Sequence, residues 1–117
     1  MSTMAIEDPV RCASRLRVGS GWNELEYDGR IVELTPMEHA LLVALLNAPV
    51  GGIAYGELAE LLWGTLVANA SGRIYVHTAN LRAKLLACTG RSRLIRARHG
   101  RLRFDARLLG DCTIVTD

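Results

Sequence analysis

Five arginines lie close together near the carboxyl-terminal end of the sequence, in the stretch RLIRARHGRLRF (93–104). They are Arg93, Arg96, Arg98, Arg101 and Arg103. A guanidinium group stays charged at neutral pH, and its planar set of N–H donors matches the oxygens of a phosphate group in pairs. Because like charges so close together repel one another, we expect an anion nearby. This stretch therefore predicts the recognition of phosphate groups.

A second stretch, RIYVHTANLRAKL (73–85), has the apolar spacing of a helix with one buried face. At about 100° per residue, Ile74, Thr78, Leu81 and Leu85 fall on one side. A helix whose outer face meets only water is polar along that face. Here the outward line of residues carries no charge, which predicts contact with a partner molecule. It consists of Gly72, Val76, Ala79, Asn80, Ala83 and Ala87.

Basic residues flank this uncharged strip. Arg73, His77 and Lys84 lie on one margin, and Arg82 lies on the other. The major groove of duplex DNA admits an α-helix and has a phosphate backbone along each edge. A helix with an uncharged centre and basic margins fits that environment.

Asn80 is the only polar side chain on the uncharged strip. An amide in that place can pair with N6 and N7 of adenine, and Val76, Ala79 and Ala83 can pack on thymine methyl groups. The alternative interpretation is that Asn80 only keeps an exposed helix soluble. The residues by themselves leave both interpretations open.

Residue types that support catalysis or metal binding do not occur in the required patterns. The cysteines, Cys12, Cys88 and Cys112, are odd in number and far apart, which fits neither a disulfide framework nor a zinc site. His39 and His99 have no partners at a triad spacing. His77 falls at the border of the buried helix face, which favours a structural or phosphate-contacting role. We expect no enzyme, no metal and no cofactor.

Length and charge place these groups in one small domain, residues 1–117. Residues 1–70 hold four arginines and nine acidic residues, a net charge of −5, whereas residues 71–117 hold ten basic and three acidic residues, a net charge of +7. The asymmetry predicts an anionic partner for the second part of the chain, and a solvated basic surface is the alternative. Without a long apolar run or a signal peptide, we expect a cytoplasmic protein with no membrane contact.

The elements that position these groups follow from turn and cap signals. Short strands with an Asp28-Gly29 hairpin turn predict an antiparallel sheet over about 10–34. Helices are predicted over about 35–48, 55–64 and 71–88, and a basic hairpin over about 93–105 around His99-Gly100. In the tail, 106–117, residues 113–116 have the composition of a strand. That strand either extends the sheet or pairs with a second copy of the chain.

The first two predicted helices have distinct starts and faces. Thr35 can cap the first, with Pro36 at its first position and Glu38 completing a capping box. The second, poorly capped helix is expected to bury Leu58, Leu61, Leu62 and Trp63 and to end at Gly64. Trp22 is expected to join the same core.

In this order the sequence resembles the OmpR/PhoB-type winged helix-turn-helix DNA-binding domains of bacterial response regulators. The resemblance lies in DGRIVELTPMEHALLVALL (28–46), YGELAELLWG (55–64), YVHTANLRAKL (75–85) and LIRARHGRLRF (94–104). It implies an α+β winged helix with an amino-terminal antiparallel sheet, three helices and a carboxyl-terminal β-hairpin wing. The receiver domain that usually precedes this module is not part of these residues. The arginines that relatives place on the third helix are replaced here by small residues.

The resemblance implies that the third helix enters the major groove and that the wing contacts the minor groove and backbone. Arg98 and Arg101, beside the wing turn, are candidates for the minor groove, with His99 between them. Arg96 and Arg103 are candidates for phosphates. The loop over 65–72 is where relatives contact RNA polymerase or a neighbouring protomer. A homodimer on DNA is a further expected partner.

Two hypotheses follow from these features. The first is a stand-alone regulator that binds double-stranded DNA. Its contacts are Arg73, Val76, His77, Asn80, Arg82, Lys84, Arg96, Arg98, His99, Arg101 and Arg103. The second is a protein-interaction winged helix that docks on another regulator or on RNA polymerase, with weak or no DNA binding.

Overall fold

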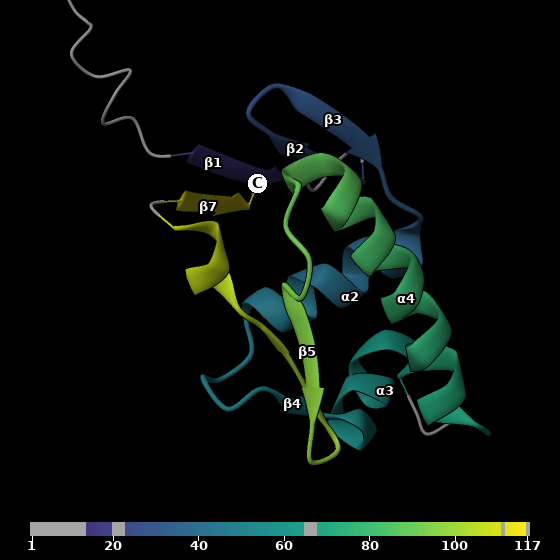
Figure 1. The fold of residues 1–117 in the computed structure, drawn as a ribbon. Helices are drawn as coiled ribbons and strands as arrows, with labels where there is room; N and C mark the ends of the chain where they lie inside the picture. Colours follow the sequence, from purple (N-terminus) through teal and green to yellow (C-terminus); the bar gives the residue numbers. More distant parts are fainter. Residues whose placement is uncertain (1–13, 20–22, 65–67, 111, 117) are drawn as a thin grey trace, which may run out of the picture.

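The computed structural model describes residues 14–19, 23–64, 68–110 and 112–116. In these ranges the chain forms two small sheets with three α-helices between and beside them (Figure 1). The strands are β1 (Ser14–Val18), β2 (Glu24–Tyr27), β3 (Arg30–Glu33), β4 (Ile53–Ala54), β5 (Ile95–Arg98), β6 (Arg101–Phe104) and β7 (Cys112–Thr116). The helices are α2 (Pro36–Leu46), α3 (Tyr55–Trp63), α4 (Ala70–Thr89) and the short 3-10 helix η2 (Ala106–Leu109).

The amino-terminal sheet has the strand order β3-β2-β1-β7. Its hairpin turn is the predicted one, because Asp28 and Gly29 have φ angles of 51° and 84°, which a tight two-residue turn requires. The tail strand pairs parallel to β1, with Ser14 opposite Cys112 and Leu16 opposite Ile114. Of the two alternatives for the tail, extension of the sheet is therefore observed. The predicted residues 10–13 of this sheet lie outside the described residues.

Helix α2 begins as predicted, with a complete capping box. The Thr35 hydroxyl accepts from the Glu38 N–H at 3.1 Å, and the Glu38 carboxylate accepts from the Thr35 N–H at 2.9 Å. Pro36 occupies the first turn, where its missing N–H costs no hydrogen bond. The body of the helix buries Leu41, Leu42 and Leu45. It lies centrally, between the two sheets.

Helix α3 covers the predicted residues, but not every residue that was expected to face the core does so. It ends at Gly64, whose φ of 76° is the left-handed conformation typical of a helix stop. Its start has no side-chain cap, although the Glu57 carboxylate accepts from the Ala54 N–H at 3.4 Å. Leu58 is buried, but Leu61 is 65% exposed, so its assignment to the core was wrong. Leu61 projects beside α2 rather than beneath it, because the apolar stripe of α3 is broader than the surface it covers.

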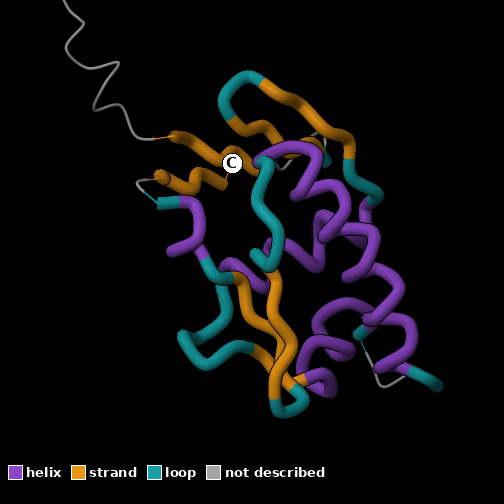
Figure 2. Tube along the Cα trace, viewed as in Figure 1, coloured by secondary structure: helices purple, strands orange, loops and turns teal. Residues whose placement is uncertain are grey.

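The carboxyl-terminal hairpin joins a third strand that the sequence does not signal. β4 is only two residues long and pairs with β6, with Ile53 opposite Leu102, to give the strand order β4-β6-β5. Gly52 permits this approach, since a Cβ there would lie 2.5 Å from the Leu102 carbonyl oxygen. We call this three-stranded sheet the wing sheet. Figure 2 shows the two sheets at opposite ends of the molecule.

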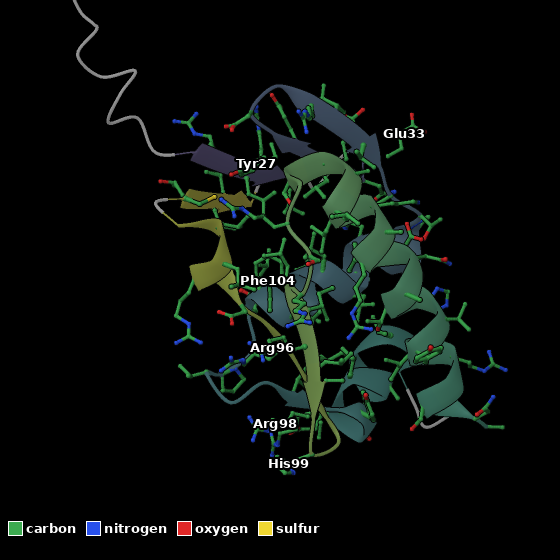
Figure 3. All side chains as sticks on the ribbon, viewed as in Figure 1. Tyr27, Glu33, Arg96, Arg98, His99 and Phe104 are labelled. Atoms are coloured by element: carbon green, nitrogen blue, oxygen red, sulfur yellow. The ribbon has the colours of Figure 1, made fainter. Side chains whose placement is uncertain are left out.

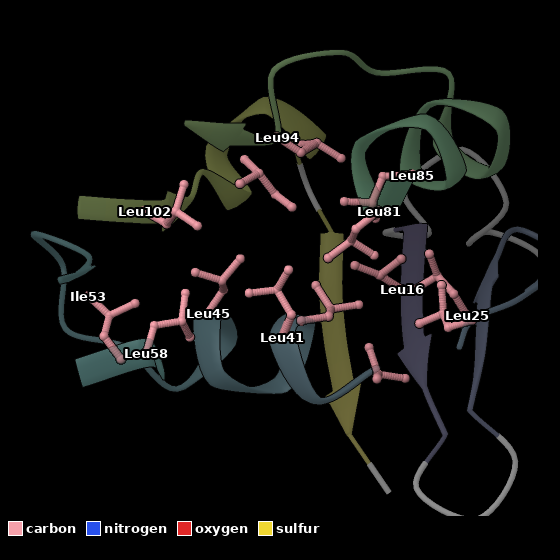
Figure 4. Close-up of a cluster of buried hydrophobic side chains, with 14 of the residues drawn as sticks. Leu16, Leu25, Leu41, Leu45, Ile53, Leu58, Leu81, Leu85, Leu94 and Leu102 are labelled. Carbon is pink, nitrogen blue, oxygen red and sulfur yellow. The ribbon is translucent and has the colours of Figure 1, made fainter. Parts of the chain in front are cut away.

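The core is aliphatic and runs along α2 from one sheet to the other (Figure 4). Ile53 and Leu58 lie at the wing end, and Leu16 and Leu25 lie at the amino-terminal sheet. Leu81 and the other buried residues of α4 close the core from the side. Trp63 is half-buried at the edge of this cluster, and Trp22 lies outside the described residues. Among the described residues, no helix is long and apolar enough to cross a membrane.

Candidate nucleic-acid interface

The uncharged strip of α4 faces outward, as predicted. Val76, Ala79, Asn80, Ala83 and Ala87 are exposed, with Val76 at 55%. Gly72 is half-buried. The opposite face carries the predicted buried residues, Ile74, Thr78, Leu81 and Leu85, together with Cys88. Helix α4 extends one residue beyond each end of its predicted range, so 70–72 are helical rather than loop, and 65–67 lie outside the described residues.

The exposed face of α4 is wider than the predicted strip. Tyr75 is 69% exposed and Leu86 is 48% exposed, and neither was among the predicted contacts. The signal for Tyr75 was its place beside Val76, only about 100° around the helix. The exposed face therefore presents an aromatic ring and a leucine as well as small residues and one amide.

The two arginines on the margins of α4 make hydrogen bonds to backbone carbonyls. The Arg73 Nε donates to the Ala68 carbonyl at 3.1 Å, which fixes the turn before the helix. The Arg82 Nε donates to the Ile95 carbonyl at 3.1 Å, at the start of β5. Arg82 therefore links α4 to the wing sheet. Each of these bonds occupies one donor and leaves the charge of the guanidinium in place.

Lys84 makes an ion pair with the buried carboxylate of Glu38, whose side chain is only 3% exposed. Burial raises the pKa of Glu38, but the hydrogen bonds from Lys84 and from the Thr35 N–H outweigh it and hold the pKa below its ordinary value. The same carboxylate thus completes the cap of α2 and holds the second half of α4. This contact positions the candidate DNA-facing helix against the core.

His77 is half-buried and lies near Trp63 at the end of α3. Their ring centroids are 6.4 Å apart, with the planes tilted by 45°. The contact holds α3 and α4 together beside the exposed strip. This placement agrees with the predicted position of His77 at the border of the buried face.

The wing hairpin places its four strand arginines on one face. Arg96 is opposite Arg103 and Arg98 is opposite Arg101, while Leu102 is buried on the other face. His99 and Gly100 form the predicted turn, with φ angles of 53° and 72°. Figure 3 shows Arg96 and Arg98 on the side of β5 that is turned away from α4, with His99 at the tip. Arg93, expected on the hairpin, precedes β5 instead.

An internal anion lies beside the wing arginines. Asp105 is 4% exposed, and its carboxylate lies 3.5 Å from Arg96, 3.5 Å from Arg103 and 3.1 Å from Arg107. The hydrogen bond from Arg107 lowers the pKa of Asp105 against the opposing effect of burial, and the charge of Arg103 lowers it further. For Arg96 and Arg103, the anion that was expected nearby is therefore present within the chain itself.

The arginines nearest the wing tip are less engaged. Arg101 donates to the Gly52 carbonyl at 3.2 Å. Arg98 makes no hydrogen bond or ion pair with any residue that the structure describes. The tip lies at the same end of the molecule as the start of α4, with α3 between them (Figure 1). Two elements suited to DNA thus project from one end.

Metal-binding and redox groups are not assembled in the described ranges. No three histidine, cysteine, aspartate or glutamate residues come together there in a way that could hold a metal ion. Cys88 and Cys112 are free thiols, and burial raises the pKa of each. Cys12 lies outside the described residues.

Comparison with known proteins agrees with this geometry. The sequence model of the family described as "Transcriptional regulatory protein, C terminal" matches residues 29–101. The fold is similar to that of EmbR from Mycobacterium tuberculosis, solved in complex with a low affinity phosphopeptide, with a TM-score of 0.64 and 22% identity. The similarity covers 85% of this chain but only 27% of that chain, so the chain spans about a quarter of EmbR. No curated protein matches the sequence significantly.

The family match and the geometry identify the same elements. Residues 29–101 run from the hairpin of the amino-terminal sheet through all three helices to the wing. The chain therefore belongs to the OmpR/PhoB-type family of transcriptional regulatory C-terminal domains, which are winged-helix DNA-binding domains.

Proposed function

We propose that this domain binds duplex DNA with α4 in the major groove and the wing tip against the adjacent minor groove and backbone. The observation that carries the proposal is that the wing tip and the start of α4, whose exposed face carries the uncharged strip, lie at one end of the molecule. The major groove of DNA is wide enough to admit an α-helix. A narrow minor groove attracts arginine side chains.

Base contacts in this arrangement come from the centre of the exposed strip. The Asn80 amide pairs with one adenine, and Val76, Ala79 and Ala83 pack on thymine methyl groups. Because only one polar side chain reaches the bases, readout is limited to few positions. Specificity then depends in part on DNA shape, chiefly on a narrow A·T-rich minor groove at the wing.

Backbone contacts come from the residues around that strip and from the wing. The exposed Arg73 and Tyr75 reach the phosphates beside the start of α4. His77 is half-buried and lies closer to the core. Arg98, His99 and Arg101 reach the backbone at the tip. Arg82 and Lys84 hold α4 in place through Ile95 and Glu38 and add positive charge near the groove edges. Arg96 and Arg103 contact Asp105 and attract the phosphate backbone at longer range, through the positive potential that they add to the wing.

The direct test is a gel-shift titration with random duplex DNA at increasing salt. A protein that neutralises several phosphates loses affinity linearly on a logarithmic plot against salt concentration. We expect such a slope for the wild-type chain. Binding that is absent at low salt, or that does not change with salt, would contradict the proposal.

A second candidate function is docking on another protein through α4. The exposed Tyr75, Val76 and Leu86 favour it, because large apolar side chains on one helix face are typical of interaction surfaces. The same gel shift distinguishes the two functions. If DNA binding is absent while Tyr75→Ala weakens binding to another regulator or to RNA polymerase, the docking function replaces the first.

A further inference from the structure

The outer face of the wing sheet contains an open hollow of about 390 Å³. We call it the arginine hollow. It is bounded by β5 and β6, by the loop before β4 and by the short helix η2. Its lining residues are Gly51, Arg96, Ala97, Arg98, His99, Arg101, Arg103 and Arg107.

The arginine hollow lies on a different side of the molecule from the exposed strip of α4. Ile53, Ile95 and Leu102 are buried on the inner face of the wing sheet, where they meet the core that α2, α3 and α4 share. Because side chains alternate along a strand, Arg96 and Arg98 project to the outer face. Figure 3 shows both on the side away from α4. A duplex held by α4 and the wing tip therefore reaches the hollow only beside the turn, at Arg98 and Arg101, and leaves the part near Arg103 and Arg107 uncovered.

The hollow has far more positive than negative charge. It is lined by five guanidinium groups. Among the residues that the structure describes, the one carboxylate that contacts them is that of the buried Asp105. Like charges placed directly opposite each other destabilise a sheet, yet Arg98 faces Arg101 and Arg96 faces Arg103. Asp105 offsets the second of these pairs. The first pair has no carboxylate within the described part of the chain.

We propose that the arginine hollow binds a small free anion that carries a diphosphate group. A guanidinium group is planar and can donate two parallel hydrogen bonds to the oxygens of one phosphate group. Two arginines that face each other across β5 and β6, together with a third arginine beside them, can therefore bind two linked phosphate groups. The volume falls in the range of small-molecule sites, roughly 300–1,000 Å³. This inference goes beyond the proposed DNA binding. Because Arg98 and Arg101 serve both, the small anion and the duplex compete for these two side chains.

The test is an NMR titration of the isotope-labelled chain with inorganic pyrophosphate at constant ionic strength. Saturable shifts are expected in the backbone amide signals of residues 96–98, 101–103 and 107. Arg98→Gln removes a hollow arginine that makes no internal contact with the described residues, so it leaves folding intact. Loss of a charge-assisted hydrogen bond should weaken pyrophosphate binding about tenfold.

Arg91→Gln is the matched control. Arg91 is exposed in the loop after α4, its side chain makes no hydrogen bond or ion pair with the described residues, and it does not line the hollow. Arg91→Gln removes one positive charge, as Arg98→Gln does, but the affinity for pyrophosphate should stay unchanged. Equal weakening by both variants would mean that only the overall charge attracts the anion, and would overturn the proposal. So would shifts that do not saturate, or equal binding of sulfate.

The same titration with a short DNA duplex separates this inference from the proposed function. Asn80→Ala should leave pyrophosphate binding unchanged, because Asn80 lies on α4. If the duplex shifts the signal of Arg107 and Arg107→Gln weakens DNA binding while pyrophosphate does not bind, the outer face is part of the DNA contact. That result would replace the small anion with the DNA backbone.

Discussion

At the level of single residues, the proposed base contact and the proposed phosphate contacts belong to different side chains. Asn80 is the one polar side chain on the uncharged strip, and it carries no charge to attract phosphates. Arg98 and Arg101 at the wing tip carry charge but little base information. The two kinds of contact can therefore be separated by single substitutions.

Asn80→Ala should cost roughly 1–3 kcal/mol of binding free energy on the preferred DNA site, because it removes a bidentate contact to one adenine. Non-specific affinity and the salt slope should stay nearly unchanged. Competition gel shifts on the preferred site and on random duplex measure both. Equal weakening on every sequence would contradict the base contact.

Arg101→Ala should weaken binding to all DNA sequences to a similar degree. If the side chain neutralises one phosphate, the slope of log affinity against log salt should shrink by about 0.9. Arg101 also donates to the Gly52 carbonyl, so thermal melting must show that the variant remains folded. If the variant no longer distinguishes the bases at one position of the site, and its salt slope is unchanged, Arg101 contacts a base instead.

At the scale of elements, the cap of α2 and the placement of α4 depend on one buried carboxylate. Glu38 accepts from the Thr35 N–H and pairs with Lys84, which lies 46 residues further along the chain. The pKa of Glu38 is lower when folded, so its stabilising contribution is present above the unfolded pKa. That contribution is lost as the pH falls below about 4.

Lys84→Met should therefore destabilise the fold at neutral pH. It leaves the buried Glu38 carboxylate without its cation, and we expect a loss of about 1–3 kcal/mol in unfolding free energy. The loss should diminish toward acid pH, where Glu38 becomes protonated in the variant. Urea unfolding at pH values from about 3 to about 7, which lie on both sides of the ordinary carboxyl pKa of about 4, measures it. Arg91→Met is the control, and an equal loss in both variants would show that the ion pair contributes nothing.

The elements themselves were largely predictable from the sequence. The Thr35–Glu38 box, the Asp28-Gly29 and His99-Gly100 turns and the Gly64 stop involve residues within four positions of one another. Strand β4 was not predicted, since two residues carry no periodicity and the pairing to β6 depends on close approach at Gly52. The inward assignment of Leu61 failed because periodicity defines a helix face but not the width of the surface that covers it.

At the scale of the whole molecule, the two ends of the described chain close one sheet. β7 pairs parallel to β1, and Cys112 and Ile114 pack against the core. Without β7, β1 becomes an exposed edge with unpaired N–H and C=O groups. The tail is thus a structural part of the fold rather than an extension beyond it.

Deletion of residues 111–117 should lower the unfolding free energy by about 2 kcal/mol, since it exposes several half-buried apolar side chains. It should also promote concentration-dependent association through the new edge. Thermal melting and sedimentation, each compared with the full chain at equal concentration, measure the two effects. Unchanged melting and an unchanged sedimentation coefficient would show that β7 contributes nothing to the fold.

Caps, tight turns and helix periodicity arise between neighbouring residues, so the helices, the turns and the uncharged strip of α4 can be read from the sequence. The tertiary structure alone decided which charges remain available to a partner. Asp105 offsets Arg96 and Arg103, and Glu38 holds Lys84. Arg103 is only two residues from Asp105, but Arg96 is nine residues away and Lys84 lies 46 residues from Glu38, so folding alone brings these two cations next to a buried carboxylate.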